Sequence, residues 1–165
     1  MMCGFVVHIC DDNQKGSYKK MMDRNRFILH RGPDKIGYLK GEHIEMAFAR
    51  LSIIDVEGGN QPLTYEDHRY SIVFNGEIYN YIELRQELIE KGKEFQTNSD
   101  TEVILALFSE IGMRVVEKLR GMFAFVIWDR EEKKAIIARD RFGIKPLYYV
   151  ESEEGIIFAS EKKRF

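Results

Sequence analysis

The sequence predicts an α+β fold made of mostly antiparallel sheets. Strand-like runs come first, helical spacing takes over at residue 79, and strand-like runs return at residue 122. This order lacks the regular alternation of a doubly wound parallel sheet. The run FAFVIW (residues 123–128) is apolar at every position. A strand of that kind is covered on both faces, which indicates a layered molecule.

Length and composition favour one globular domain over residues 1–165. The chain has 165 residues, of which 44% are hydrophobic, and a formal net charge of −2. A domain of this length can bury roughly 70% of its unfolded surface. The scattered basic residues favour neither nucleic acid nor a membrane surface as a partner, and no apolar run approaches the roughly 20 residues of a membrane span. Two cysteines, Cys3 and Cys10, without zinc spacing or a signal peptide, favour a cytoplasmic location.

The first half of the chain contains three strand-like runs, at residues 3–10, 45–55 and 70–80. The third is expected to stop at Asn75-Gly76. Ser17 can cap a helix that runs to residue 29, and the Gly-Pro pair within HRGPD (residues 30–34) ends it.

Two helices are expected next. The first begins at Tyr79 and ends at Gly92, a good residue for a helix C-terminus. Ser99 and Glu102 match a capping box for the second, whose apolar stripe follows at residues 103–108. Four further strand-like runs, with REEK as the hairpin connection between the first two, span residues 122–129, 134–141, 145–150 and 153–161.

Cys3 stands near the start of the chain, where a thiol is a poor core residue because chain ends fray. A thiol with an ordinary pKa near ~8.5 needs a base or a positive field to become a thiolate. His8, five residues along the same strand, is about 16 Å away. The α-amino group of Cys3 itself would reach the sulfur if the chain were cleaved just before it. The alternative is a small buried hydrophobe that begins a strand.

Asn75-Gly76 also permits two interpretations. The pair commonly forms a hairpin turn. Here a helix follows the strand, so an amide donor and an unhindered backbone N–H would stand together and could stabilise an oxyanion.

Three charged residues suit either a structural role or a ligand. Arg50 lies in an apolar run and needs a carboxylate partner from the protein or from a ligand. Asp100 either belongs to the helix start or receives an ammonium group. Glu77 is either a first-turn charge favoured by the helix dipole or a ligand contact. The arginine-rich RDRFGIKPLYY (residues 139–149) is interpreted as a charged corner without chemistry of its own.

A family resemblance rests on ten stretches that appear in one order over nearly the whole chain. They are MCGF, HRGPD, RLSIID, NQPL, FNGEIYN, SDTEVI, GMFAF, WD, ARDRFGIKPLYY and FASE. Together they resemble the N-terminal glutaminase domain, a class II glutamine amidotransferase, of glutamine-hydrolysing asparagine synthetases. The combination of RLSIID, NGEIYN and SDTEVI is the specific part of this resemblance.

The resemblance implies an N-terminal-nucleophile hydrolase fold, a four-layer αββα sandwich. It implies Cys3 as the nucleophile with its own α-amino group as general base. The Asn75 side chain and the Gly76 backbone N–H would form the oxyanion hole. This chain begins Met-Met-Cys where the family begins Met-Cys, so the base exists only if Met1 and Met2 are both removed.

The same resemblance implies how the substrate is held. Arg50 would bind the α-carboxylate of L-glutamine, Asp100 would receive its α-ammonium with help from Glu77, and the backbone near Ile53 and Ile54 would complete the pocket. Glutamine would then be hydrolysed to glutamate and ammonia through a thioester.

This half-reaction would need no metal or cofactor. ATP and Mg are expected for a C-terminal synthetase domain of the full-length protein, which would use the ammonia to make asparagine and would be a partner of this domain. The alternatives are a glutaminase that serves a sugar or peptide acceptor, and a non-catalytic glutamine-binding or regulatory relative. The oligomeric state stays open, with a homodimer among the alternatives.

Overall fold

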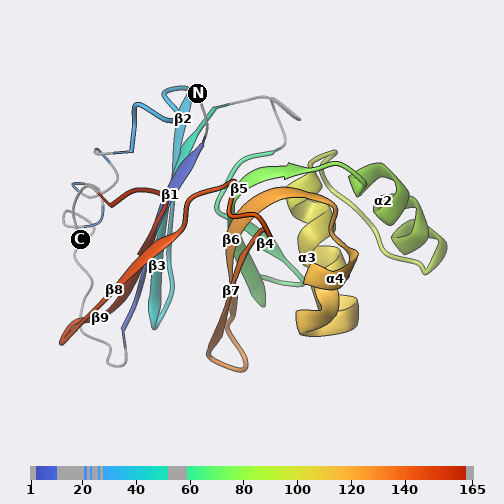
Figure 1. Cartoon of the computed structure of the whole chain (residues 1–165). Coiled ribbons are helices and arrows are strands. Elements are labelled where there is room, and N and C mark those ends of the chain that lie inside the picture. Colours follow the sequence, from blue (N-terminus) through green and yellow to red (C-terminus); the bar gives the residue numbers. More distant parts are fainter. Residues whose placement is uncertain are drawn as a thin grey trace.

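A computed structural model describes residues 3–10, 21, 23, 26, 28–51 and 59–162 of the chain (Figure 1). Two sheets lie face to face, and helices cover the second one on its far side. No helix among the described residues is long and apolar enough to cross a membrane.

The first sheet has five strands in the order β2-β3-β1-β9-β8. The strands are β1 (Gly4–Ile9), β2 (Lys35–Lys40), β3 (Ile44–Arg50), β8 (Tyr148–Ser152) and β9 (Gly155–Ala159). The second sheet has four strands in the order β4-β5-β6-β7. They are β4 (Leu63–Tyr65), β5 (Tyr70–Ile78), β6 (Gly121–Asp129) and β7 (Lys134–Arg139). Every pairing is antiparallel, as the sequence predicts.

Strand β6 explains why the molecule is layered. Its residues Phe123, Phe125 and Ile127 pack into the core beneath the helices, whereas Ala124, Val126 and Trp128 pack against the first sheet. Side chains alternate between the two faces of a strand, so an unbroken apolar run must be covered twice. The prediction drawn from FAFVIW is therefore confirmed.

The helical layer on the second sheet consists of α2 (Tyr81–Glu90), α3 (Asp100–Ile111), the 3₁₀ turn η1 (Gly112–Arg114) and α4 (Val115–Lys118) (Figure 1). Helix α3 is buried at every position from residue 100 to 108, so it is a core helix and not only an amphipathic one. On the outer face of the first sheet, Met21 and Ile28 pack against Val6, Ala47 and Ile157. The helix expected after Ser17 lies largely outside the described residues.

Ser99 caps α3 as predicted, whereas α2 begins at Tyr81 and not at Tyr79, because strand β5 continues to Ile78. The hydroxyl of Ser99 accepts a hydrogen bond from the backbone N–H of Glu102 at 3.3 Å. The Glu102 carboxylate turns instead to Thr97, accepting from its N–H at 2.7 Å and its hydroxyl at 2.6 Å. Helix α2 ends at Glu90 with Lys91 as its C-cap, and the next residue, Gly92, has a φ of +86°, a left-handed conformation that suits glycine. The N–H of the next residue, Lys93, bonds back to Leu88 O at 2.9 Å.

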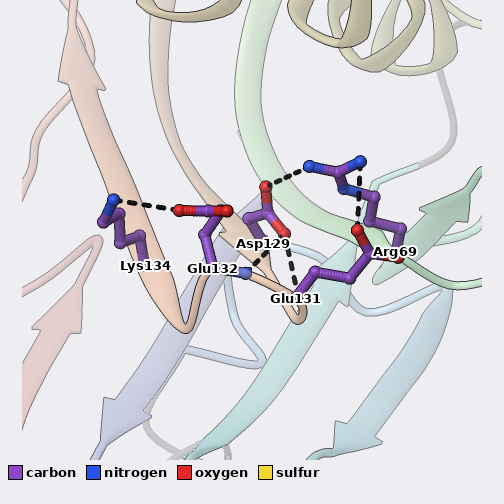
Figure 2. A network of polar contacts seen from close by, with 5 residues as sticks. All are labelled: Arg69, Asp129, Glu131, Glu132 and Lys134. Carbon is purple, nitrogen blue, oxygen red and sulfur yellow. Dashed lines mark hydrogen bonds and ion pairs between the residues drawn. The ribbon is translucent and has the colours of Figure 1, made fainter.

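The hairpin between β6 and β7 follows the predicted REEK connection. Asp129 closes it: one carboxylate oxygen accepts from the N–H groups of Glu131 and Glu132 at 3.0 and 3.2 Å. Its other oxygen accepts from Arg69, which also pairs with Glu131, and Lys134 pairs with Glu132 on the opposite side of the turn (Figure 2). These contacts join the hairpin to β5 at the end of the sandwich.

The predicted end of the third strand is wrong. Strand β5 does not stop at Asn75-Gly76 but continues to Ile78, because β6 pairs with it along its whole length, up to Ile78 opposite Gly121. Neither residue of the Asn-Gly pair has the positive φ that a hairpin turn of that type requires. Glu77 is likewise a strand residue, so its alternative role in the first turn of a helix is excluded.

Candidate functional site

One pocket, of about 70 Å³, gathers most of the residues that the sequence singles out. Cys3, Arg50, Gly76, Glu77 and Asp100 all line it. These residues come from the start of β1, the end of β3, the last part of β5 and the first turn of α3. The topology brings them together because β1 and β3 are neighbours in the first sheet and β5 lies in the facing sheet.

The thiol of Cys3 lies against the backbone just beyond β3. Its sulfur is 3.2 Å from Leu51 N and 3.3 Å from Leu51 O. Burial raises the pKa of the thiol, although the Leu51 N–H and the positive charges of Arg50 and Lys145 act in the opposite direction. A buried thiol of this kind is mostly protonated at neutral pH, so it needs a base before it can act as a nucleophile.

The carbonyl of Cys3 is also held in place. Arg31, from the HRGPD segment, donates from Nε to Cys3 O at 3.0 Å and from Nη1 to Glu161 at 2.9 Å. Gly4 allows this approach, because a Cβ at that position would lie 2.9 Å from the Arg31 side chain. The backbone that carries the thiol is thereby fixed from two sides.

Asn75 is 1% exposed, and its side-chain amide nitrogen is unusual. Within the described part of the chain, Nδ2 is one of three buried side-chain nitrogen or oxygen atoms that lack a hydrogen-bond partner. Leaving a buried donor unpaired costs about 1–3 kcal/mol. A strand residue that keeps such a donor is suited to an acceptor that arrives with a ligand.

Gly76 must be glycine for steric reasons. A Cβ there would lie 2.3 Å from the carbonyl oxygen of Met122 on β6 and 2.7 Å from the Phe74 ring. The residue does not provide a turn, because it pairs with Phe123 inside the β5–β6 ladder, so the turn alternative for Asn-Gly is excluded. Glycine at this position lets the β5 backbone lie close to Met122 of β6 and to the Phe74 ring, one residue after the unpaired amide of Asn75.

Arg50 ends β3 and is 5% exposed. Its Nη1 donates to the side-chain oxygen of Asn60 at 3.2 Å. Asn60 belongs to NQPL, a motif to which sequence reasoning gave no role. A guanidinium held in this way at a pocket wall presents a planar fork that matches a carboxylate.

Asp100 is the acidic counterpart of Arg50. It is 4% exposed, and its Oδ2 accepts a hydrogen bond from the backbone N–H of Ile78 at 3.1 Å. Burial raises the pKa of this carboxyl to about 6, with a further contribution from the charge of Glu77, against the lowering effect of the Ile78 and Thr101 N–H groups. Two carboxylates in one pocket therefore favour a cationic ligand.

Sequence reasoning missed Gln61. Its side-chain amide donates to Phe74 O at 3.1 Å and accepts from Phe74 N at 2.6 Å, like one more residue of a pairing strand. It also donates to the Thr101 hydroxyl at 3.3 Å, which joins β5 to the start of α3. Gln61 thus fixes the position of the β5 backbone at Phe74, the residue immediately before Asn75. A glutamine before proline carries no sequence signal for such a role. Ile53 and Ile54, the remaining predicted pocket residues, lie outside the described residues.

Comparisons with known proteins agree with this architecture. The family model described as a glutamine amidotransferase domain matches residues 2–165. Asparagine synthetase [glutamine-hydrolyzing] 1 of Bacillus subtilis is 52% identical over 98% of this chain and 26% of its own length. Asparagine synthetase [glutamine-hydrolyzing] 3 of Arabidopsis thaliana is 43% identical over 98% of this chain and 28% of its own length. The chain spans about a quarter of the length of these curated relatives.

A solved structure supports the fold. The glutamine phosphoribosylpyrophosphate amidotransferase from B. subtilis, complexed with ADP and GMP, superposes with a TM-score of 0.63 at 23% identity. The match covers 96% of this chain and 35% of that one. This match and the two facing antiparallel sheets of the present chain confirm the predicted N-terminal-nucleophile hydrolase sandwich. Sequence and fold together place this chain in the glutamine amidotransferase domain family.

Proposed function

We propose that this chain hydrolyses the side-chain amide of L-glutamine to glutamate and ammonia, with Cys3 as the nucleophile. The observation that carries the proposal is the buried, unpaired Nδ2 of Asn75, which lies on β5 between Phe74 and Gly76, two residues that line the pocket together with the Cys3 thiol. An amide donor without a partner in the free protein is preorganised for the negative oxygen of a tetrahedral intermediate. Membership of the family supports the same reaction.

The pocket also suits an α-amino acid. Arg50 binds the α-carboxylate, and Asp100 receives the α-ammonium with Glu77 nearby. The predicted contact with the backbone near Ile53 and Ile54 concerns residues outside the described ones and stays a prediction. An amino acid held at both charged ends presents its side-chain amide to Cys3 in one orientation, and such positioning lowers the entropic cost of the reaction.

The reaction then proceeds in two steps. The α-amino group of Cys3 takes the thiol proton, and the thiolate attacks the amide carbon of glutamine. Asn75 Nδ2 and the Gly76 N–H stabilise the oxyanion. The C–N bond breaks as the leaving nitrogen gains a proton, which releases ammonia and leaves a γ-glutamyl thioester on Cys3. Water, deprotonated by the same amino group, attacks the thioester, and glutamate leaves with the thiol restored.

The fate of the ammonia is a second part of the proposal. The relatives named above are glutamine-hydrolysing asparagine synthetases, and each is about four times as long as this chain. We infer that the domain supplies ammonia to an ATP- and Mg-dependent synthetase domain of the same protein, which amidates aspartate. When glutamine, ATP and aspartate are all added, this chain alone is expected to release glutamate and ammonia and to form no asparagine.

The test compares two forms of the chain that differ only at the start. One is released by a protease so that Cys3 is the first residue, and the other keeps Met2 in front of it. Glutamate release from glutamine is expected only from the first, and Cys3→Ala in that form should abolish it. Removing a positioned base typically costs about 10²–10⁴-fold in rate. Equal rates for the two forms would exclude the α-amino group as the base. Equal rates for Cys3→Ala and its parent would exclude the thiol as nucleophile.

A further inference from the structure

A chain of hydrogen bonds reaches Cys3 from the end of strand β9, outside the pocket. Arg31 donates from Nε to Cys3 O at 3.0 Å and from Nη1 to the Glu161 carboxylate at 2.9 Å. All three residues belong to the described part of the chain, but only Cys3 lines the pocket of about 70 Å³. Glu161 lies in the FASE stretch (residues 158–161), and the mechanism above gives it no part.

Arg31 is a buried cation whose orientation depends on its two acceptors. Its side chain is 10% exposed, and its third nitrogen, Nη2, is buried without a hydrogen-bond partner. Removing a guanidinium from water is costly unless a negative group pairs with it. Among the described residues, Glu161 is the carboxylate that pairs with this charge. Without it, Arg31 would keep the Cys3 carbonyl as its acceptor but would lose the ion pair that holds the guanidinium there.

Glu161 is itself held beside the start of β1. The preceding residue, Ser160, is fully buried and bonds twice to Phe5: its N–H donates to Phe5 O, and its Oγ accepts from Phe5 N, both at 3.0 Å. Strands β1 and β9 pair antiparallel with Val6 opposite Ala159, so the end of β9 must lie beside the first residues of β1. The backbone that carries Glu161 is therefore fixed to the strand that begins next to Cys3.

The pair of Arg31 and Glu161 is the buried part of a larger cluster. His30 Nε2 lies 2.9 Å from the same carboxylate oxygen of Glu161, but the His30 side chain is 62% exposed and that of Glu161 only 21%. Burial opposes the charge of Glu161, yet hydrogen bonds from Arg31 and His30 hold the pKa of this carboxyl below its usual value. Exposed ion pairs contribute little, whereas a sheltered, charge-assisted hydrogen bond can hold one geometry.

The same contacts restrict the α-amino group of Cys3. The Leu51 N–H lies 3.2 Å from the sulfur, and Arg31 holds the carbonyl oxygen. The amino group is attached to the Cα between these two held groups, so little freedom remains for its nitrogen. A general base must lie within hydrogen-bond reach of the proton that it takes. Holding the carbonyl therefore helps to keep the nitrogen close to the thiol.

We propose that Glu161 is a positioning residue, which acts through Arg31 on the Cys3 carbonyl and thereby places the α-amino group that serves as the base. The role deepens the proposed function and rests on it. Because Glu161 lies outside the pocket, its loss should slow the reaction without weakening glutamine binding. A displacement of about 1 Å caused by a distant substitution can cost about 10²-fold in rate.

The kinetic test replaces Glu161 in the chain that has Cys3 as its first residue. Glu161→Ala is expected to lower kcat by about 10- to 10²-fold and to leave KM for glutamine within about twofold of the parent. Glu161→Gln keeps an acceptor oxygen of the same reach and should restore kcat to within about threefold. His30→Ala removes the exposed partner of the same carboxylate and is the matched control, with kcat unchanged. Parental kcat in a folded Glu161→Ala chain would overturn the proposal, as would a loss that appears in KM alone.

Arginine side-chain NMR tests the same contact without glutamine. The ¹⁵N signal of the Arg31 Nε–H, assigned by its absence in Arg31→Lys, should exchange slowly with water because the group is buried and hydrogen-bonded. Glu161→Ala should raise this exchange rate by about tenfold or more and shift the ¹³C signal of the Cys3 carbonyl, whereas His30→Ala should change neither.

The two measurements separate the failure of this inference from that of the proposed function. An unchanged Arg31 exchange rate and Cys3 carbonyl shift in Glu161→Ala would overturn the inference even if the chain hydrolyses glutamine. A parent chain that releases no glutamate, although its Arg31 signal depends on Glu161, would instead refute the proposed function and support the contact that holds the Cys3 carbonyl.

Discussion

Replacing Asp100 by asparagine is expected to weaken glutamine binding at neutral pH while stabilising the empty protein. The carboxyl is buried, and burial raises its pKa from 3.8 to about 6. The folded state therefore holds the proton more tightly than the unfolded chain does. As pH rises from about 4 to 6, the contribution of this group to the free energy of unfolding falls, and it stays low above that range.

The magnitude follows from the pKa difference. Ionising Asp100 in the empty pocket costs about 3 kcal/mol relative to the unfolded chain. Asparagine has nearly the same shape, carries no charge, and can still accept the hydrogen bond from the Ile78 N–H. Asp100→Asn should therefore raise the free energy of unfolding by up to about 3 kcal/mol at pH 7.5 and by only about 1 kcal/mol at pH 4.5, as measured by urea denaturation.

Glutamine should bind more tightly when Asp100 is ionised, because the α-ammonium of glutamine needs the negative carboxylate. The empty protein, in contrast, is more stable when Asp100 is protonated. With a pKa of about 6, the ionised fraction of Asp100 falls about tenfold between pH 7 and pH 5. Calorimetric titration in a Cys3→Ala background, which prevents turnover, should give a dissociation constant for glutamine that rises about tenfold over this range. Glutaramate, which lacks the α-amino group, is the control ligand and should show no such rise.

Two results would refute this reasoning. One is glutamine affinity that does not change between pH 5 and pH 7 in the Cys3→Ala chain. The other is a loss of affinity in Asp100→Asn that is equal for glutamine and glutaramate. Because the charge of Glu77 contributes to the raised pKa, Glu77→Gln should move the midpoint of the pH dependence downward, and an upward movement would contradict the assigned cause.

The remaining predictions concern the oxyanion donors, the carboxylate anchor and the buried carboxylate of Asp140. Asn75→Ala should lower kcat by about 10²–10³, because the proposed side-chain donor to the oxyanion is lost; an unaltered kcat would remove this residue from the reaction. Gly76→Ala should lower both stability and activity, since its Cβ would lie 2.3 Å from Met122 O, and a crystal structure with unmoved strands would contradict that clash. Arg50→Lys should raise KM for glutamine because the planar fork is lost, and an unchanged KM would argue against carboxylate binding. Asp140→Ala leaves several buried N–H groups without an acceptor and should reduce the free energy of unfolding by about 3 kcal/mol or more; a loss below about 1 kcal/mol in urea denaturation would be inconsistent.

Much of the fold follows from local patterns in the sequence. The apolar run at residues 123–128 predicts a doubly covered strand, and β6 is one. Ser99 and Gly92 mark the helix ends where they were expected, because capping depends on a few neighbouring residues. The short strands β2 and β4 did not stand out, since their half-exposed residues lack a strong alternation and their pairing depends on distant partners.

The site was predictable only in part. Cys3, Arg50 and Asp100 are unusual where they stand in the sequence, so they attracted attention before their proximity was known. Gln61 and Glu161 did not, because their roles depend on tertiary contacts with Phe74 and with Arg31. A hairpin turn was one of two interpretations of the Asn-Gly pair, because local statistics cannot register the pairing with β6 that extends the strand through it.

The central claim is that glutamine is cleaved through a covalent bond to Cys3, and acid quenching tests it most directly. The chain with Cys3 as its first residue is mixed with isotope-labelled glutamine and quenched within one turnover, and its peptides are analysed by mass spectrometry. One labelled γ-glutamyl group is expected on the peptide that begins with Cys3, and none in Asn75→Ala at the same early time. Release of labelled glutamate while Cys3 stays unmodified at every time point, or a label on another residue, would contradict it.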